Sequence, residues 1–158
     1  MEDRQQTEKQ QFVEHFGIVF ERTGLPKMTG RIFGWLLISD PPYQSTDQLA
    51  EALLASKGSI STTTRLLIQT NLIERFTLPG VRHDYFRLRP DAWRNLIKHG
   101  VEDELKMIRQ LAEQGMQSFT ETTPLTQACL ERMHNMYAFF EREFPLLLER
   151  WEQEKVKE

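Results

Sequence analysis

Apolar residues recur every three or four positions through most of this chain, which is the spacing of one face of an α-helix. Four long stretches show this spacing: residues 5–23, 27–39, 91–119 and 124–151. Glycine or proline follows the first two stretches, and both residue types end helices. The pattern therefore predicts a mainly helical protein. In the first two helices the side chains expected to face the core are Phe12, Phe16, Val19 and Phe20, then Ile32, Phe33, Leu36 and Leu37.

The part of the chain after the second helix predicts two short helices joined by a tight turn. Ser45 or Thr46 is a suitable N-cap for the first of them, because a hydroxyl can accept a hydrogen bond from an unpaired amide of the first turn. We expect Lys57-Gly58 to end this helix and Ser59 to cap the next one. A short glycine-containing turn between two helices is the arrangement of a helix-turn-helix. The apolar face of its second helix is expected at Ile60, Thr64 and Leu67.

A β-hairpin is predicted directly after these helices. Residues 72–76 and 84–88 are rich in strand-forming side chains, and Pro79-Gly80 between them is typical of a turn. Residues 43–45 are expected to add a short strand to the same sheet. A hairpin that follows a helix-turn-helix is the wing of a winged helix.

The second helix of the pair carries a short polar face opposite its apolar face. Ser61, Thr62, Arg65 and Gln69 lie on it. Such a face fits a DNA major groove, because hydroxyls reach phosphates or base edges and arginine can bind guanine through two hydrogen bonds. An ordinary solvated helix face has the same composition. The three consecutive threonines 62–64 favour a DNA-binding face over a solvated one, because threonine has a low propensity for exposed positions of a helix.

Charge is distributed unevenly along the chain. The whole chain has a net charge of −3. The segment from Lys57 to Arg94 nevertheless holds seven Lys and Arg residues against three acids. Arg82 and His83 would lie at the tip of the hairpin, where a cation suits a minor groove or the flanking phosphates. The local positive charge favours a nucleic-acid partner.

These segments resemble the winged helix of MarR-type regulators. The residues that carry the resemblance are Leu49-Ala50-Glu51, Ser56-Lys57-Gly58-Ser59-Ile60-Ser61, Arg65, Leu67, Leu72-Ile73-Glu74-Arg75 and Pro79-Gly80-Val81-Arg82. The Ser-Lys-Gly-Ser-Ile-Ser run and the Gly-x-Arg wing are most similar to the GbsR-like branch. The chain departs from many MarR proteins in having Gly80-Val81-Arg82 where they have Asp-x-Arg, so the acid that would orient Arg82 is missing.

The resemblance implies a prokaryotic, homodimeric transcription factor that binds double-stranded DNA, usually as a repressor and often under the control of a small effector. GbsR-like relatives suggest a choline-like cation as that effector. Aromatic residues such as Trp35, Tyr43 and Trp93 would suit a cationic ligand, although aromatics at helical spacing are more often core residues. The DNA-binding residues expected are Lys57, Ser59, Ser61, Thr62, Arg65, Arg82 and His83.

The long C-terminal stretches predict how two copies pair. The apolar stripe of the last helix is longer than one small winged helix can cover, so we expect it to pack against a second chain. Pro145 inside that helix predicts a kink or a restart near Phe144. The fold class is thus mainly α with a small β-hairpin wing, a winged helix-turn-helix flanked by long N- and C-terminal dimerisation helices. We expect one domain over residues 1–158, with the winged helix at 27–90 and the dimerisation helices at 5–24 and 91–157.

Several other classes of protein find no support in the sequence. No apolar run reaches the ~20 residues of a membrane span, and the polar N-terminus is no signal peptide. The single cysteine, Cys129, allows no internal disulfide and fits a reducing cytoplasm, where a DNA-bound regulator associates with the nucleoid. On the apolar stripe it is a candidate buried thiol, with a redox sensor as the alternative.

No spacing of the four histidines predicts a metal site, and no catalytic constellation or cofactor motif occurs. A DNA-binding regulator that is not an enzyme is therefore expected. A winged-helix protein-interaction module without DNA binding is the alternative.

Overall fold

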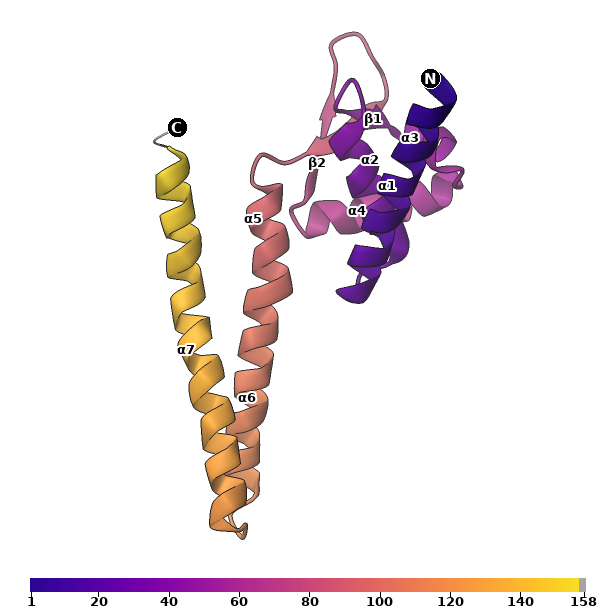
Figure 1. The fold of residues 1–158 in the computed structure, drawn as a ribbon. Coiled ribbons are helices and arrows are strands. Elements are labelled where there is room, and N and C mark those ends of the chain that lie inside the picture. Colours follow the sequence, from indigo (N-terminus) through magenta and orange to yellow (C-terminus); the bar gives the residue numbers. More distant parts are fainter. Residues whose placement is uncertain (157–158) are drawn as a thin grey trace. The chain divides into compact units, whose positions relative to one another are not determined.

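The computed structural model describes residues 1–156, and the chain divides into two compact units between Asn95 and Leu96 (Figure 1). The first unit contains, in order, α1 (Glu2–Arg22), α2 (Lys27–Ile38), β1 (Gln44–Ser45), α3 (Thr46–Leu53), α4 (Lys57–Gln69), β2 (Ile73–Thr77) and β3 (Asp84–Leu88). Helix α5 (Ala92–Ile97) crosses the division, and the second unit continues with a π-helical turn, η1 (Lys98–Glu102), α6 (Asp103–Ser118) and α7 (Pro124–Lys155). This order confirms the predicted fold class. Among the described residues, no helix is long and apolar enough to cross a membrane.

Helices α1 and α2 pack with their backbones in close approach. A Cβ atom on Gly30 would overlap the carbonyl oxygen of Phe16 and would come within 2.8 Å of the Cα of Gly17. Only glycine permits this approach, because any other residue carries that atom. The rings of Phe16, Phe20 and Phe33 then meet across the two helices, with centroids 5.8 Å apart for Phe16–Phe33 and 5.3 Å for Phe20–Phe33.

Three residues expected to face the core do not. Val19 is 54% exposed, Phe12 is 37% exposed and Leu37 is 36% exposed. Val13 and Gly17 are buried instead, so the packed face of α1 is turned away from Val19. The prediction was wrong because glycine adds nothing to a hydrophobic pattern, although here it marks the centre of the packed face.

The turn of the helix-turn-helix lies earlier than expected. Helix α3 ends at Leu53, and Leu54 takes the left-handed conformation, with φ 50° and ψ 45°. Lys57 and Gly58 are the first residues of α4, and the hydroxyl of Ser56 caps that helix by accepting the amide of Ser59 at 3.1 Å. The predictions that Lys57-Gly58 ends α3 and that Ser59 is the cap were therefore wrong. At the other end of α3, the expected Ser45 cap is confirmed and forms a reciprocal capping box with Gln48.

The apolar face of α4 is confirmed, since Ile60, Thr64 and Leu67 are all buried. Thr63 is buried as well. The hydroxyls of Thr63 and Thr64 donate to the backbone carbonyls of Ser59 and Ser61, at 2.8 and 3.1 Å. Only Thr62 of the three threonines is exposed, so the run of threonines reflects buried hydroxyls that are satisfied within the helix.

The wing is a three-stranded antiparallel sheet in the order β1-β3-β2. Strands β2 and β3 pair from Ile73 opposite Leu88 to Thr77 opposite Asp84. Gly80 has φ 79°, and the amide of Val81 donates to the carbonyl of Leu78 at 3.1 Å, which confirms the expected turn. The short strand expected near residue 44 is also confirmed, since Gln44 pairs with Phe86.

In the second unit, α6 and α7 pack against each other. Arg109 of α6 forms an ion pair with Glu141 of α7, and His134 lies 3.0 Å from Glu113. Helix α7 starts where expected, with Thr123 as N-cap, and runs without interruption past Pro145. The predicted restart was therefore wrong, while the alternative of a kink stays a prediction. Cys129 is exposed in the single chain, which contradicts the prediction of a buried thiol.

Candidate nucleic-acid interface

Helix α4 presents the polar face predicted for it. Its buried residues face α2 and β2, which leaves the opposite side in solvent. That side carries Ser61, Thr62, Arg65 and Gln69, all exposed. Ser59 is half-buried beside the capping serine. The structure thus places the predicted groove residues on one accessible face, while their contact with DNA stays a prediction.

The exposed arginines of the first unit differ in whether they have a partner. Arg65 on α4 and Arg82 in the wing loop form no hydrogen bond or ion pair with the described residues. Lys57 pairs with Asp47 at 3.0 Å, but both side chains are largely exposed, and such a pair contributes little in water. Uncommitted guanidinium groups can bind phosphate or guanine without first breaking an internal pair. Arg65 and Arg82 are therefore the strongest candidates for direct DNA contacts.

Other cations of the wing brace the hairpin. Arg75 lies 3.6 Å from Asp84 across the two strands, and Arg87 lies 2.7 Å from Glu74. The guanidinium of Arg87 also lies over the ring of Phe76, 4.3 Å from its centroid. These contacts join β2 to β3. The wing that carries Arg82 thus uses these cations for contacts between its own strands, in addition to the backbone pairing of β2 with β3.

The aromatic face of the hairpin adds to this bracing. The ring of Phe76 meets those of Tyr43 and Tyr85, with centroids 5.4 and 5.9 Å away. His83 of the predicted tip is exposed, and its ring lies 4.9 Å from that of Tyr85. Of the two tip residues, only Arg82 extends from the wing without such a contact.

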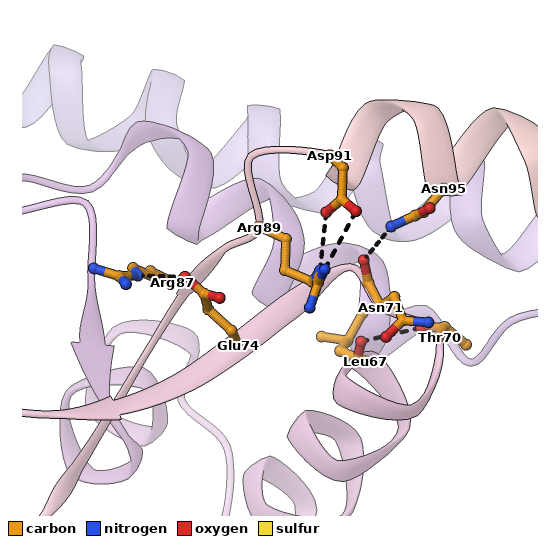
Figure 2. A network of polar contacts seen from close by, with 8 residues as sticks. All are labelled: Leu67, Thr70, Asn71, Glu74, Arg87, Arg89, Asp91 and Asn95. Carbon is orange, nitrogen blue, oxygen red and sulfur yellow. Dashed lines mark hydrogen bonds and ion pairs between the residues drawn. The ribbon is translucent and has the colours of Figure 1, made fainter. Parts of the chain in front are cut away.

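A polar network fixes the far end of α4 to the base of the wing (Figure 2). Asn71 follows α4 in the left-handed conformation, with φ 56°. The side-chain amide of Asn95 donates to its backbone carbonyl at 2.9 Å. Arg89 donates twice to Asp91, at 2.9 and 3.2 Å, and this hydrogen bonding holds the pKa of Asp91 below its ordinary value. The network ties α5 to the end of α4.

Most of this network has no signature in the sequence. Asn71 carried a local signal, because asparagine after a helix often takes the left-handed conformation. Asn95 carried no local signal, since its partner, Asn71, lies 24 positions earlier in the chain. Arg31 was missed for the same reason. It donates to Glu14 of α1 and to the carbonyl of Leu53.

The aromatic residues considered for a cationic effector pack in different surroundings in the first unit. Trp35 lines a cleft of about 220 Å³ beside Glu14 and Arg31. Tyr43 packs in the wing, and Trp93 packs edge-on against Phe33 at 5.3 Å. In the second unit, Phe139 and Phe140 line an open groove along α7. An effector site stays a prediction.

Comparison with known proteins decides the family. A family model described as "MmpR5-like MarR family transcriptional regulator" matches residues 91–154. The HTH-type transcriptional regulator MmpR5 of Mycobacterium tuberculosis is 39% identical over 131 residues, which cover 83% of this chain and 79% of that protein. The chain belongs to the MarR family of transcriptional regulators.

Two further matches agree with that assignment. A crystal structure of a transcriptional regulator shares 37% identity and superposes with a TM-score of 0.72, covering 92% of this chain and 99% of the other. The putative HTH-type transcriptional regulator YvaV of Bacillus subtilis is 28% identical over 86 residues, 54% of this chain and 48% of that protein. The resemblance to MarR-type winged helices is thus confirmed, and the chain is a DNA-binding transcriptional regulator, not an enzyme. The GbsR-like branch stays a prediction.

The family model matches a part of the chain that lies outside the winged-helix motifs. Residues 91–154 comprise α5, η1, α6 and nearly all of α7, so the match lies outside the helix-turn-helix and the wing. The motifs that resemble MarR-type winged helices lie in residues 49–82. The two lines of evidence therefore use different parts of the chain and reach the same family.

Proposed function

We propose that the chain acts as a homodimeric, sequence-specific repressor that binds a palindromic operator in double-stranded DNA and is released by a small effector. The observation that carries the proposal is the exposed polar face of α4 with its unpaired Arg65. In this arrangement Ser59, Ser61, Thr62 and Arg65 contact the major groove, Lys57 contacts phosphate, and Arg82 and His83 contact the flanking DNA.

The composition of α4 favours DNA over a protein partner. A helix that docks on another protein usually presents a contiguous apolar patch. Leu66 and Ile68, the two apolar residues of α4 outside its core face, are both half-buried. The exposed side of α4 consists instead of hydroxyls, an amide and a guanidinium, which are groups that contact phosphates and base edges.

Dimerisation is supported by the second unit. Helix α7 has 32 residues, and none of them is buried in the single chain. Large apolar side chains, including Phe140, Leu147 and Trp151, stay exposed along it. Regulators of this family typically act as dimers. A second copy is therefore the occupant we propose for these apolar faces, with the dimerisation helices in 5–24 and 91–157 and the winged helix in 27–90.

A two-fold dimer makes a specific demand on the operator. Its two α4 helices would contact half-sites about 34 Å apart, one turn of DNA. Selection from a pool of random duplexes at near-physiological salt should therefore enrich an inverted repeat with that spacing. Weak, unselective binding that modest salt abolishes would contradict the proposal, because only the general attraction to phosphate would then remain.

Arg65→Ala tests the assigned face. We expect it to abolish selection of the operator, with a loss of about 1–3 kcal/mol per specific base contact, while the fold and the dimer stay intact. Arg22→Ala is the matched control, because Arg22 is an exposed arginine in the last turn of α1 with the same charge. Equal affinities of the two variants for the operator would refute the assignment.

Arg82→Ala tests the wing. Because Arg82 would contact phosphate, its loss should weaken binding to all duplexes and reduce the slope of log affinity against log salt by about one. An unchanged slope would show that the wing loop does not touch the backbone of DNA.

A further inference from the structure

Arg31 joins three helices of the first unit. It lies on α2, and its Nε donates to Oε1 of Glu14 on α1 at 2.6 Å. Its Nη2 donates to the backbone carbonyl of Leu53 at the end of α3 at 2.9 Å. The side chain is 21% exposed, so this contact is largely withdrawn from water.

The carbonyl that Arg31 binds needs an external donor. The last four carbonyls of a helix lack an intrahelical amide, and the helix dipole makes that end negative. Leu53 is the last residue of α3. The amides of Leu54 and Ala55 turn back to Glu51 and Ala50 and leave the Leu53 carbonyl to the guanidinium. A cation is a favourable partner at this position.

The bond lies directly before the strained residue of the turn. Leu54 is 89% exposed, so its left-handed conformation is not held by burial of its side chain. A non-glycine residue keeps such a conformation only when its surroundings determine it. The orientation of the Leu53 carbonyl sets the peptide plane that enters Leu54. Two residues later, Ser56 caps α4.

We propose that Arg31, oriented by Glu14, is a positioning residue that fixes the α3–α4 turn and thereby the direction of α4 on DNA. The inference rests on the proposed function, in which α4 contacts the major groove. Arg31 itself does not touch DNA in this scheme. Its removal leaves the winged helix folded and allows the turn and the N-terminal end of α4 to move.

Lys27 provides a matched control. It also lies on α2 and also pairs with Glu14, Nζ to Oε2 at 3.3 Å, but it does not reach Leu53. Arg31→Met and Lys27→Met remove the same charge from the same helix, so their effects on the general attraction to DNA are equal. They differ in the bond to the turn. Circular dichroism and thermal unfolding of both variants establish that the fold is kept.

Hydrogen exchange tests the turn without DNA. In Arg31→Met the protection of the Leu54 and Ala55 amides should fall on the order of tenfold, because a bond from a charged donor is lost, and in Lys27→Met it should not change. In the second arm, operator affinity should fall on the order of tenfold in Arg31→Met relative to Lys27→Met, with equal affinities for non-specific duplex and equal salt slopes. Arg31→Lys should recover part of both effects.

Equal exchange and equal operator affinity in the two variants would overturn the proposal. If Arg31→Met does not fold, Glu14→Gln is measured in both arms, since it keeps Arg31 but removes the carboxylate that orients it. Faster exchange at Leu54 and Ala55 then supports the proposal, and unchanged exchange contradicts it. A wild-type protein that selects no duplex would refute the proposed function, whereas the exchange arm decides the role of Arg31 at the turn by itself.

Discussion

The two units of this chain bury their apolar side chains to very different degrees. The first unit has a core of phenylalanine, leucine, isoleucine and valine drawn from α1 to α4 and the sheet, to which α5 adds Ala92. In the second unit, Ala112 and Gly115 are the buried residues among those that the structure describes, and α7 contributes none. The first unit therefore holds its own core, and the second is an antiparallel pair of helices with most of its apolar surface unburied.

This difference indicates which unit would gain stability from a partner. A domain stabilises itself by removing apolar area from water, at roughly 25 cal/mol per Å². In the single chain, the α6–α7 pair removes little apolar area from water. Polar contacts such as Arg109 with Glu141 join the two helices. Exposed side chains like Phe140 and Trp151 gain this stabilisation only in an assembly. The predictions below, in order of decreasing effect, change one unit at a time.

Gly30→Ala should have the largest effect, and it should be confined to the first unit. Its new Cβ would overlap the backbone of Phe16, which cannot move away as a flexible side chain can. We expect a loss of about 3 kcal/mol in the free energy of unfolding, measured by urea denaturation. Gly100→Ala is the control, since a Cβ there meets no atom within 4 Å. Similar destabilisation by both substitutions would mean that close approach of α1 and α2 is not what Gly30 provides.

Leu147→Glu should separate the copies in the second unit. Leu147 is 51% exposed in the single chain and lines the apolar groove of α7. A carboxylate buried at an interface without a partner costs several kcal/mol, so sedimentation equilibrium should show a monomer for this variant and, under the proposed function, a dimer for the unaltered chain. Gln153→Glu adds the same charge at an exposed polar position of α7 and should stay dimeric. If Leu147→Glu remains a dimer, a different face mediates association.

Leu54→Gly should stabilise the first unit slightly. Glycine accepts the left-handed conformation that Leu54 is held in, and little packing is lost at an exposed residue. We expect a gain of about 0.5–1 kcal/mol in the free energy of unfolding. Asn71→Gly should give a smaller gain, because asparagine tolerates φ 56° better than leucine tolerates φ 50°. A loss of stability in Leu54→Gly would show that its side chain contributes to the turn.

Acid should weaken the α6–α7 contact. The hydrogen bond from His134, followed by that from Arg109, holds the pKa of Glu113 below its ordinary value of 4.5. A carboxyl whose pKa is lowered by folding stabilises the fold above its ordinary pKa and loses that contribution as the pH falls through the lowered value. Thermal unfolding of the second unit between about pH 6 and about pH 3 should show this loss, and Glu113→Gln should reduce it. Identical pH profiles would exclude Glu113 as a source of the acid sensitivity.

Much of the site followed from local sequence signals. The polar face of α4 was predicted from spacing alone, and Arg65 lies on it. The Pro79-Gly80 turn placed Arg82 in the wing loop, because glycine provides the positive φ that the turn needs. The cap at Ser45 was likewise visible, since a capping hydroxyl acts within three residues. Each of these features depends only on residues that lie within a few positions of one another in the chain.

The turn between α3 and α4 was decided by the tertiary structure. Ser59 was the predicted cap of α4 and Gly58 the predicted end of α3, whereas Ser56 caps α4 and α3 ends at Leu53. Leu53 and Ile60 must both reach the core, and the chain meets that demand by reversing at Leu54, where no local preference favours the conformation. A long-range bond from Arg31 lies at the same point.

By itself, then, the sequence determined the order of helices and strands, the wing turn and the polar face of α4, because periodicity and capping act over three or four residues. Only the tertiary structure decided which side of α1 packs and where α3 ends. It also decided that Arg31 binds the last residue of α3 and that Asn95 binds Asn71, which follows α4. These outcomes depend on groups 17 to 24 positions apart, such as Arg31 with Glu14 and Asn95 with Asn71, and no pattern in one sequence records such a pairing.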